Sequence, residues 1–507
     1  MRSRRRDVMV PSTSTPNDSP IVRQWGAYRD SRRRRRPPRL VWAVLAAATL
    51  AAAGAAVWLA ARPHPWRPPS GSPHFTSCTY GGYVSAWCGR LAVPEDPRRP
   101  RGRTISLRVA VLPATERPAE GALFYLEGGP GGAATASAVR VNELFAQVAR
   151  NRDLVLVDQR GTGGSSRLAC PRARVRAADA AAVAVYVHRC FAGLRRDPRL
   201  YTTSVAADDL DAVRRAMGYG RVDVYGGSYG ATLALAFLQQ HPRAVRTAVL
   251  DSGSLPDVHV YERSAANAQS AVDAVLARCA AAPACRREFP HPDRDLATLL
   301  ARAPRRVTVE AGRVLLRPVD VAWTVESLTA TAEGAATLPF VLRAAVRGNY
   351  LPLGRTFVND VGADLDARAR LAMFWEILCS EPWARFGAVA TATSYLARAA
   401  AERAHVFGRA CRWVPNGRVA GVVAAAFPGP VLLLAGGADP LDPAPNLRGW
   451  RRAFPHGRLV VVPAAGHGAI GYGCVPALVA RFVARADAST LDTACVRHVP
   501  PPAFELG

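Results

Sequence analysis

Short apolar runs recur between residues 109 and 462, with helix-like stretches between several of them. Stretches of helical periodicity include Asp208–Met217 and Ala231–Gln240, the second of which stops at His241-Pro242. Continuous apolar runs that alternate with helices predict an α/β fold with a mostly parallel sheet buried on both faces. The predicted strands are Val109–Leu112, Ala122–Leu126, Leu154–Val157, Val222–Tyr225, Ala248–Leu250, Val431–Leu434 and Leu459–Val462.

The pattern changes between Pro256 and about Pro428, where Ala- and Arg-rich helical periodicity replaces most strand-like runs. A helical insertion inside the α/β domain explains this change. We therefore expect a core in two parts, residues 76–255 and 429–507, with a helical cap over residues 256–428 between them.

An uncharged apolar segment lies near the N-terminus. Residues 1–39 carry 12 arginines and three acidic residues, and the 22 uncharged residues 40–61 follow them. As a helix these 22 residues would measure about 33 Å, enough for a bilayer core of roughly 30 Å. The arginine excess predicts a cytoplasmic N-terminus, a membrane anchor at 40–61, a Pro/Gly/Ser-rich linker at 62–75 and an extracellular catalytic part. A signal peptide cleaved near Ala51–Ala53 is the alternative, with a secreted product.

All ten cysteines follow the apolar segment, an even number that is typical of an oxidising compartment. There is no Cys-x-x-Cys pair, so we expect neither a metal site nor a thioredoxin-like site. Nearest-neighbour pairing is the simplest connectivity, although the sequence does not fix it and scattered buried thiols are the alternative. The expected pairs are Cys78 with Cys88, Cys170 with Cys190, Cys279 with Cys285, Cys379 with Cys411, and Cys474 with Cys495.

Composition narrows the chemistry. The 507 residues carry a net charge of +27, and every basic residue other than histidine is arginine. Without lysine, Schiff-base enzymes and the G-x-x-x-x-G-K-[ST] phosphate loop are excluded. Residues 1–39 alone contribute +9, the remaining charge is spread out, and no nucleic-acid-binding motif accompanies it. We therefore expect no nucleic-acid partner.

The strongest motif is Gly226-Gly-Ser-Tyr-Gly230, which lies between a predicted strand and a predicted helix. In G-x-S-x-G the chain turns so sharply that glycines are needed on both sides of an exposed serine. Ser228 is therefore the candidate nucleophile. The alternative is a glycine-rich turn with an idle serine.

A serine nucleophile needs a base and an orienting acid. Asp439 follows the predicted strand at 431–434, and His467 follows the strand at 459–462. The chain order Ser228, Asp439, His467 is the order of α/β-hydrolases. Fallback residues are Asp442 as the acid, and His456 or His498 as the base.

Acyl transfer also needs N–H donors for the oxyanion. The glycine loop Glu127-Gly-Gly-Pro-Gly-Gly132 follows a predicted strand, and the backbone N–H groups of Gly131 and Tyr229 are the candidate donors. A phosphate-binding loop is the alternative, but no lysine and no strict G-x-G-x-x-G is present.

Six motifs together resemble the secreted actinobacterial tripeptidyl aminopeptidases and their prolyl-aminopeptidase relatives. The likeness spans roughly residues 75–497, including the cysteine-rich C-terminal region. It implies an α/β-hydrolase with a helical cap that needs no cofactor and cleaves short peptides from a free amino terminus through an acyl-enzyme. The motifs are Glu127-Gly-Gly-Pro-Gly, Asp158-Gln-Arg-Gly-Thr-Gly163, Tyr201-Thr-Thr, Gly226-Gly-Ser-Tyr-Gly230, Gly437-Ala-Asp-Pro440 and Gly466-His-Gly468.

In that family, carboxylates from the cap often hold the substrate's α-ammonium group. The resemblance therefore implies Glu381, in Cys379-Ser-Glu-Pro-Trp383, as a substrate-binding residue, with Glu376 as a weaker candidate and a surface acid at a helix end as the alternative.

Glu127 departs from the family pattern, since the relatives commonly have His or Asn directly before Gly-Gly-Pro-Gly. Its carboxylate would either oppose the developing oxyanion or be held by Arg160, and the stretch Asp158–Gly163 is interpreted as a supporting turn. The substrate class therefore stays open. An esterase or lipase would ignore a free α-amine, and an inactive membrane-anchored binding scaffold is the alternative outside enzymes. The oligomeric state is not predicted.

Overall fold

The computed structural model describes residues 66, 68, 74–171, 179–310, 312–362, 371–386, 394–415, 422 and 426–507. The predicted basic segment 1–39, the predicted anchor 40–61 and most of the predicted linker lie outside this part of the chain. Within the described residues, no helix combines the length and the apolar character that crossing a bilayer requires.

A nine-stranded sheet forms the centre of the fold, in the order β1-β2-β3-β5-β4-β6-β7-β10-β11. The six strands from β5 to β11 run parallel, and β1, β2 and β3 form an antiparallel edge. The predicted mostly parallel sheet is therefore confirmed. The strands are β1 (Phe75–Tyr80), β2 (Val84–Pro94), β3 (Thr104–Leu112), β4 (Gly121–Leu126), β5 (Arg152–Val157), β6 (Val222–Gly227), β7 (Val245–Asp251), β10 (Val431–Gly436) and β11 (Gly457–Val462).

Each predicted strand coincides with all or part of an observed one, whereas β1 and β2 were not predicted. The reason lies in their burial, because β1 has one buried residue and the buried positions of β2 are separated by exposed or partly exposed ones. Neither strand therefore contains the continuous apolar run that marks a strand covered on both faces.

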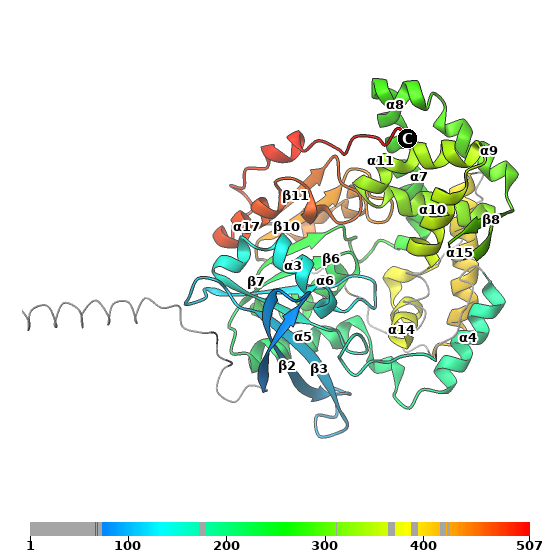
Figure 1. Cartoon of the computed structure of the whole chain (residues 1–507). Coiled ribbons are helices and arrows are strands. Elements are labelled where there is room, and N and C mark those ends of the chain that lie inside the picture. The colour runs from blue at the N-terminus through cyan, green and yellow to red at the C-terminus, as the bar shows by residue number, and fades with distance from the viewer. Residues whose placement is uncertain are drawn as a thin grey trace, which may run out of the picture. The chain divides into compact units, whose positions relative to one another are not determined.

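Helices cover both faces of the sheet (Figure 1). Helices α5 (Thr203–Ala216) and α6 (Tyr229–Gln240) cover one face, and α3 (Ala138–Leu144) and α17 (Val475–Arg485) cover the other. The short helix α16 (Trp450–Ala453) precedes β11. Both cores draw on the same central strands, since alternate residues of β5 enter opposite clusters.

Most of the described residues between β7 and β10 are helical. They also form a hairpin that the sequence did not predict, β8 (Arg305–Val309) with β9 (Gly312–Leu316). Helix α4 (Ala180–Ala192) belongs to the first half of the chain, yet it packs against α15 of this segment (Figure 1). Among the described residues between β7 and β10, the helices include α7 (Val260–Ala281), α8 (Pro283–Glu288), α9 (Pro292–Arg302), α10 (Pro318–Thr329), α11 (Ala332–Val346), α12 (Leu351–Thr356), a π-helix (Phe357–Gly362), α14 (Ala372–Ser380) and α15 (Tyr395–Cys411).

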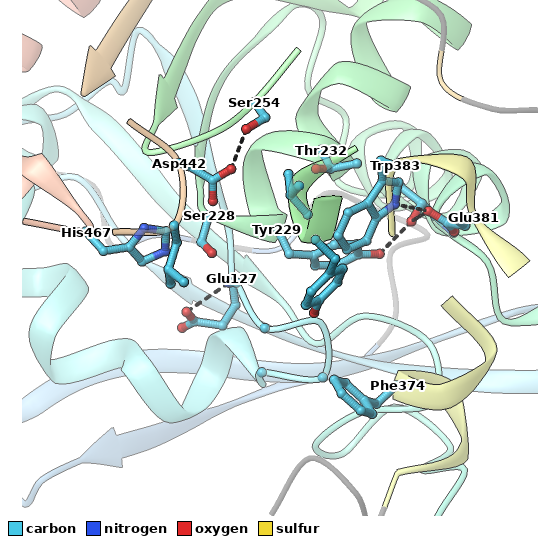
Figure 2. A pocket seen from close by; sticks show the side chains of 18 of the residues that line it. Glu127, Ser228, Tyr229, Thr232, Ser254, Phe374, Glu381, Trp383, Asp442 and His467 are labelled. Carbon is cyan, nitrogen blue, oxygen red and sulfur yellow. Dashed lines mark hydrogen bonds between the residues drawn. The ribbon is translucent and has the colours of Figure 1, made fainter. Parts of the chain in front are cut away.

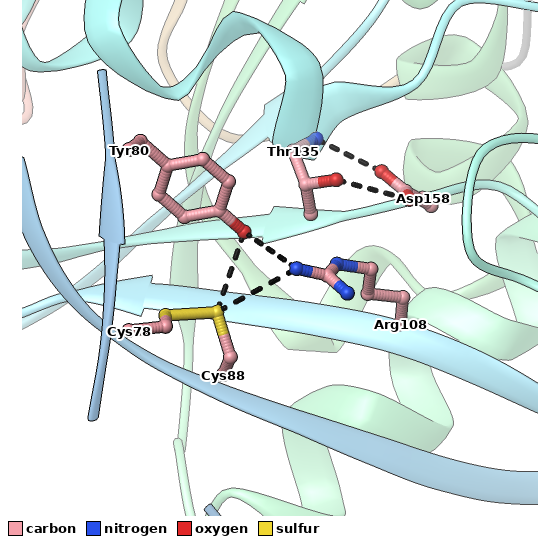
Figure 3. Close-up of a disulfide and its surroundings, with 6 residues drawn as sticks. All are labelled: Cys78, Tyr80, Cys88, Arg108, Thr135 and Asp158. Atoms are coloured by element: carbon pink, nitrogen blue, oxygen red, sulfur yellow. Dashed lines mark hydrogen bonds between the residues drawn. A yellow bond between two sulfur atoms is a disulfide. The ribbon is translucent and has the colours of Figure 1, made fainter. Parts of the chain in front are cut away.

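Five disulfides form, and each joins the cysteines predicted to pair. Cys379–Cys411 ties the end of α14 to the end of α15. Cys78–Cys88 links β1 to β2, where the Tyr80 hydroxyl and the Arg108 guanidinium approach the Cys88 sulfur (Figure 3). Cys78–Cys88 thus stabilises the antiparallel edge of the sheet, and Cys379–Cys411 stabilises the helical segment between β7 and β10.

Candidate active site

Ser228 occupies a strained turn between β6 and α6, with φ of +55°. A Cβ at position 226 would lie 2.2 Å from the Gly230 carbonyl oxygen, and a Cβ at position 230 would lie 2.2 Å from the Leu126 carbonyl oxygen. Both positions therefore require glycine, as the motif predicts. The Ser228 N–H donates to the Asp251 carbonyl at 2.9 Å, which fixes the turn to the end of β7.

Asp439 and His467 meet although 28 residues separate them. Nδ1 of His467 lies 3.1 Å from each carboxylate oxygen of Asp439, and the N–H groups of Leu441 and Asp442 also donate to Asp439 Oδ1. The acid is 1% exposed. This arrangement leaves the other ring nitrogen of His467 for Ser228, whose side chain faces the same cavity (Figure 2).

Each member of this pair stabilises the charged form of the other. Burial alone would lower the pKa of His467, but the carboxylates around it, Asp439 foremost, raise that pKa. Burial alone would raise the pKa of Asp439, but the imidazolium and the N–H donors hold it below its ordinary value. Asp439 is thus suited to orient the base and to stabilise its protonated form.

The fallback residues occupy other places. Asp442 lines the cavity but makes no hydrogen bond to the imidazole, while His456 and His498 are exposed and do not line the cavity. Among the described residues, the structure brings only Asp439 to Nδ1 of His467.

A cavity of about 880 Å³ opens over Ser228, between the carboxyl ends of the parallel strands and the helices of the segment between β7 and β10. One wall comes from the loops after β4, β6, β7 and β10, and the opposite wall from α10, α14 and α15. The second wall includes Trp323, Phe374 and Phe407, together with an ion pair between Arg403 and Glu326 at 2.7 Å. The cavity can hold several residues of a peptide.

The predicted oxyanion donors both line this cavity. Tyr229 opens α6, and the first N–H groups of a helix have no partner within the helix. In the glycine loop, the N–H groups of Gly128 and Gly132 donate to Glu127 Oε1 and to the Gly128 carbonyl. The Gly131 N–H donates to no described residue, so it stays the predicted second donor.

Glu127 is not held by Arg160, which excludes one of the two alternatives that the sequence left open. Its Oε2 accepts from Tyr125 at 3.3 Å and from Ser137, and its Oε1 accepts from the Gly128 N–H at 3.0 Å. Arg160 is fully buried elsewhere, in a bidentate pair with Asp209.

Glu381 lies in the cavity wall, 5% exposed. Its Oε1 accepts from the Thr203 N–H, and its Oε2 accepts from the Thr203 hydroxyl at 2.8 Å and from the Trp383 indole at 2.7 Å. Burial raises the pKa of Glu381. Since two carboxylate oxygens offer about four acceptor positions, one remains for a ligand.

A hydrogen-bonded chain connects Glu381 to the nucleophile turn. The Thr203 hydroxyl lies 2.7 Å from the Tyr229 hydroxyl, which also accepts from Gln159 at 2.9 Å. Sequence reasoning missed Thr203 and Trp383 as partners of Glu381. The one sequence feature that could have suggested these two residues is their position in the stretches Tyr201-Thr-Thr and Cys379-Ser-Glu-Pro-Trp383.

Glu376 lies on α14 but outside the cavity lining. It is fully buried, and its Oε1 accepts from Ser380 at 2.8 Å. Burial raises its pKa to about 7. The structure therefore does not bring the weaker candidate into the site.

Another support that the sequence did not reveal is Asp251. Its carboxylate accepts from the N–H groups of Ala469 and Ile470 and from the Tyr225 hydroxyl, each within 2.9 Å. These bonds hold the loop that carries His467 against the end of β7.

Within the described residues, no cluster of three His, Cys, Asp or Glu side chains can hold a metal ion.

Comparison with known proteins agrees with the fold class that the sequence predicted, an α/β-hydrolase. Residues 121–473 match the model of the alpha/beta hydrolase fold. The serine protease Hip1 of Mycobacterium tuberculosis is 31% identical over 275 residues, 48% of this chain and 52% of that protein. A tripeptidyl aminopeptidase of Streptomyces lividans is 32% identical over 186 residues, 32% of this chain and 35% of that protein.

A proline iminopeptidase of Neisseria gonorrhoeae is 32% identical over 128 residues, 25% of this chain and 31% of that protein. The chain thus matches about half the length of the Hip1 protein and about a third of the other two. The family model covers most of the chain, including the residues from the glycine loop to the turn that carries His467. The protein therefore belongs to the α/β-hydrolase fold family.

Proposed function

We propose that this protein is an exported serine aminopeptidase that releases short N-terminal peptides or single residues. The observation that carries the proposal is one cavity lined by Ser228, His467 and the buried carboxylate of Glu381. The matched relatives named tripeptidyl aminopeptidase and proline iminopeptidase support a peptidase.

The reaction follows from the side chains at the turn. His467, oriented by Asp439, takes the hydroxyl proton as Ser228 Oγ attacks the carbonyl carbon. The N–H groups of Tyr229 and Gly131 stabilise the oxyanion, each donor contributing about 3 kcal/mol where such groups have been removed. His467 then protonates the leaving amine. In the second step His467 takes a proton from water, the water attacks the acyl-enzyme carbonyl, and Ser228 Oγ leaves with the proton that His467 returns.

A free amino terminus is recognised at Glu381. An α-ammonium group would meet a buried carboxylate that lines the cavity and keeps one acceptor position, across Tyr229 from the nucleophile (Figure 2). Since the Thr203 and Trp383 donors already hold this carboxylate, it is preorganised for the ligand. The charge-assisted contact favours free over blocked termini by roughly tenfold or more.

Export rests on two observations. Residues 40–61 are apolar and follow an arginine run, and ten cysteines form five disulfides in the part of the chain that follows. We propose anchoring by residues 40–61 with an extracellular catalytic part, which extraction of the full-length chain only by detergent would support. A soluble product that begins between residues 53 and 62 would instead support secretion.

The catalytic proposal is tested with a fluorophosphonate label. Wild type and Ser327→Ala, which removes another cavity-lining hydroxyl, should be labelled, and Ser228→Ala should not. Labelling of Ser228→Ala would refute the nucleophile assignment.

Substrate class is tested with free-amino peptides, amino-blocked peptides and simple esters. Wild type should prefer free peptides, and Glu381→Gln should lose that preference. Glu288→Gln, which removes an exposed acid from α8, should keep it. Equal turnover of blocked and free peptides by wild type would refute an aminopeptidase and favour an esterase or endopeptidase.

A further inference from the structure

The loop after β10 presents a second carboxylate to the cavity. Asp439 accepts the N–H groups of Leu441 and Asp442, at 2.8 and 2.9 Å, and turns its own side chain to His467. Asp442 lines the cavity together with Ser228, and it lies close enough to His467 for its charge to help raise the pKa of the imidazole. The two acids of one loop therefore have different tasks.

Asp442 is only half satisfied by the protein. Its Oδ1 accepts from the Ser254 hydroxyl, which in turn accepts from Asn446 Nδ2 at 2.9 Å. Asn446 adds a second side-chain hydrogen bond to this carboxylate, which still leaves about two of its four acceptor positions. In Figure 2, Oδ2 lies toward Ser228. The buried cavity-wall cation Arg403 is already paired with Glu326. A fixed acceptor thus points into the space where substrate must lie.

This acceptor carries charge at neutral pH. Burial, with repulsion from Asp439, raises the pKa of Asp442 to about 6. The groups that face it are His467, Asp439, Ser254 and Asn446. A partly desolvated carboxylate with an open acceptor position favours a cationic ligand.

The position of Asp442 indicates which part of the substrate it meets. Glu381, which the proposed function assigns to the amino terminus, lies on the Tyr229 side of Ser228 (Figure 2). Asp442 instead belongs to the loop of Asp439 that holds His467, and its charge acts on that imidazole. His467 delivers its proton to the leaving amine, so the leaving group lies on that side. The two carboxylates therefore face opposite ends of the cleaved bond.

We propose that Asp442 is a specificity determinant that binds the cationic side chain of an arginine or lysine directly after the cleaved bond. This inference rests on the proposed function for the direction in which the peptide lies. A charge-assisted hydrogen bond predicts at least a tenfold higher kcat/KM for arginine than for its uncharged analogue citrulline.

The first test uses wild type alone. Free-amino peptides that differ only in the residue after the cleaved bond, arginine, lysine, citrulline or norleucine, are digested and their products are identified by mass spectrometry. Arginine and lysine should exceed their neutral analogues at least tenfold. Equal rates, or a preference for arginine before the cleaved bond instead, would overturn the proposal.

The second test assigns the preference to its residue. In Asp442→Asn the ratio of arginine to citrulline substrates should fall to about one, whereas Ser254→Ala, which keeps the carboxylate, should retain a ratio well above one. An unchanged ratio in Asp442→Asn would overturn the assignment.

A third test separates this inference from the proposed function. Acetylcholine and 3,3-dimethylbutyl acetate differ in the charge of the leaving group and carry no peptide bond. If peptides are not cleaved, the aminopeptidase proposal fails. A preference for the choline ester that Asp442→Asn abolishes would still support a cation site at Asp442, and equal rates for the two esters would refute it.

Discussion

Arg160 provides a sharp test of how the fold supports the site. It is fully buried, with Nε and Nη2 each 2.7 Å from an oxygen of Asp209. Its remaining N–H groups donate to backbone carbonyls, including those of Glu95 at 2.8 Å and Leu200 at 3.0 Å. These bonds join the end of β2 to the segment that leads into α5, where Thr203 holds Glu381.

Arg160→Met removes the cation but approximately keeps the apolar stem. Asp209 is left buried without its partner, and burial already raises its pKa despite Arg160. Removing one member of a buried pair costs about 3–5 kcal/mol. The additional change Asp209→Leu removes the isolated carboxylate, so the double variant should regain at least about 1.5 kcal/mol relative to additive losses.

Urea unfolding of the full chain, with disulfides intact, measures these free energies. Arg98→Met is the matched control, because the Arg98 side chain is 84% exposed in its pair with Asp96, and it should cost at most about 1 kcal/mol. A loss below about 1 kcal/mol for Arg160→Met, or strict additivity in the double variant, would refute the reasoning.

Three further predictions concern the site and its frame. Because nearby carboxylates raise the pKa of His467 and only the neutral imidazole can accept the serine proton, kcat/KM should rise with pH along a limb centred above the ordinary 6.5, and a limb below 6 would contradict this. Gly230→Ala places a Cβ 2.2 Å from the Leu126 carbonyl oxygen, so its fluorophosphonate labelling rate should fall at least about tenfold, whereas wild-type labelling would contradict the clash. Replacing both Cys379 and Cys411 by Ala opens a loop with a sequence separation of 32 residues, which should cost about 3–4 kcal/mol by urea unfolding; a loss under 1 kcal/mol would argue against it.

The parts of the fold that the sequence predicted are those with strong local signals. All six residues of strand β5 are buried, and its last four, 154–157, form one continuous apolar run. The glycines around Ser228 follow from the turn itself. The hairpin of β8 and β9 carries exposed arginines at three of its ten positions, so its pattern gave no such signal. Strands β1 and β2 also lacked a strand signal, because exposed and partly exposed residues make up most of their positions.

Side-chain contacts across the fold were less accessible. Glu381 and Thr203 are separated by 178 residues, and no periodicity connects them. For Arg160 the sequence left Glu127 open as one possible partner, and nothing in the local pattern pointed to Asp209, which is the partner in the structure. In contrast, Asp439 and His467 could be paired because each follows a strand of a parallel sheet, and the carboxyl ends of such strands meet at one edge.

The oxyanion loop shows how the departure at position 127 fits an acyl-transfer site. An acid at this position would oppose an oxyanion if its charge faced the nucleophile, but Glu127 is held by the Tyr125 and Ser137 hydroxyls and by the Gly128 N–H. Since that bond occupies the Gly128 N–H and Pro130 has no N–H, the loop must offer another donor. The Gly131 N–H makes no bond within the described residues, and the positive φ of Gly131, +109°, is one that side chains rarely adopt. The acid thus restricts which N–H can serve the oxyanion, and the three neutral donors that hold its carboxylate stabilise its charge beside the loop.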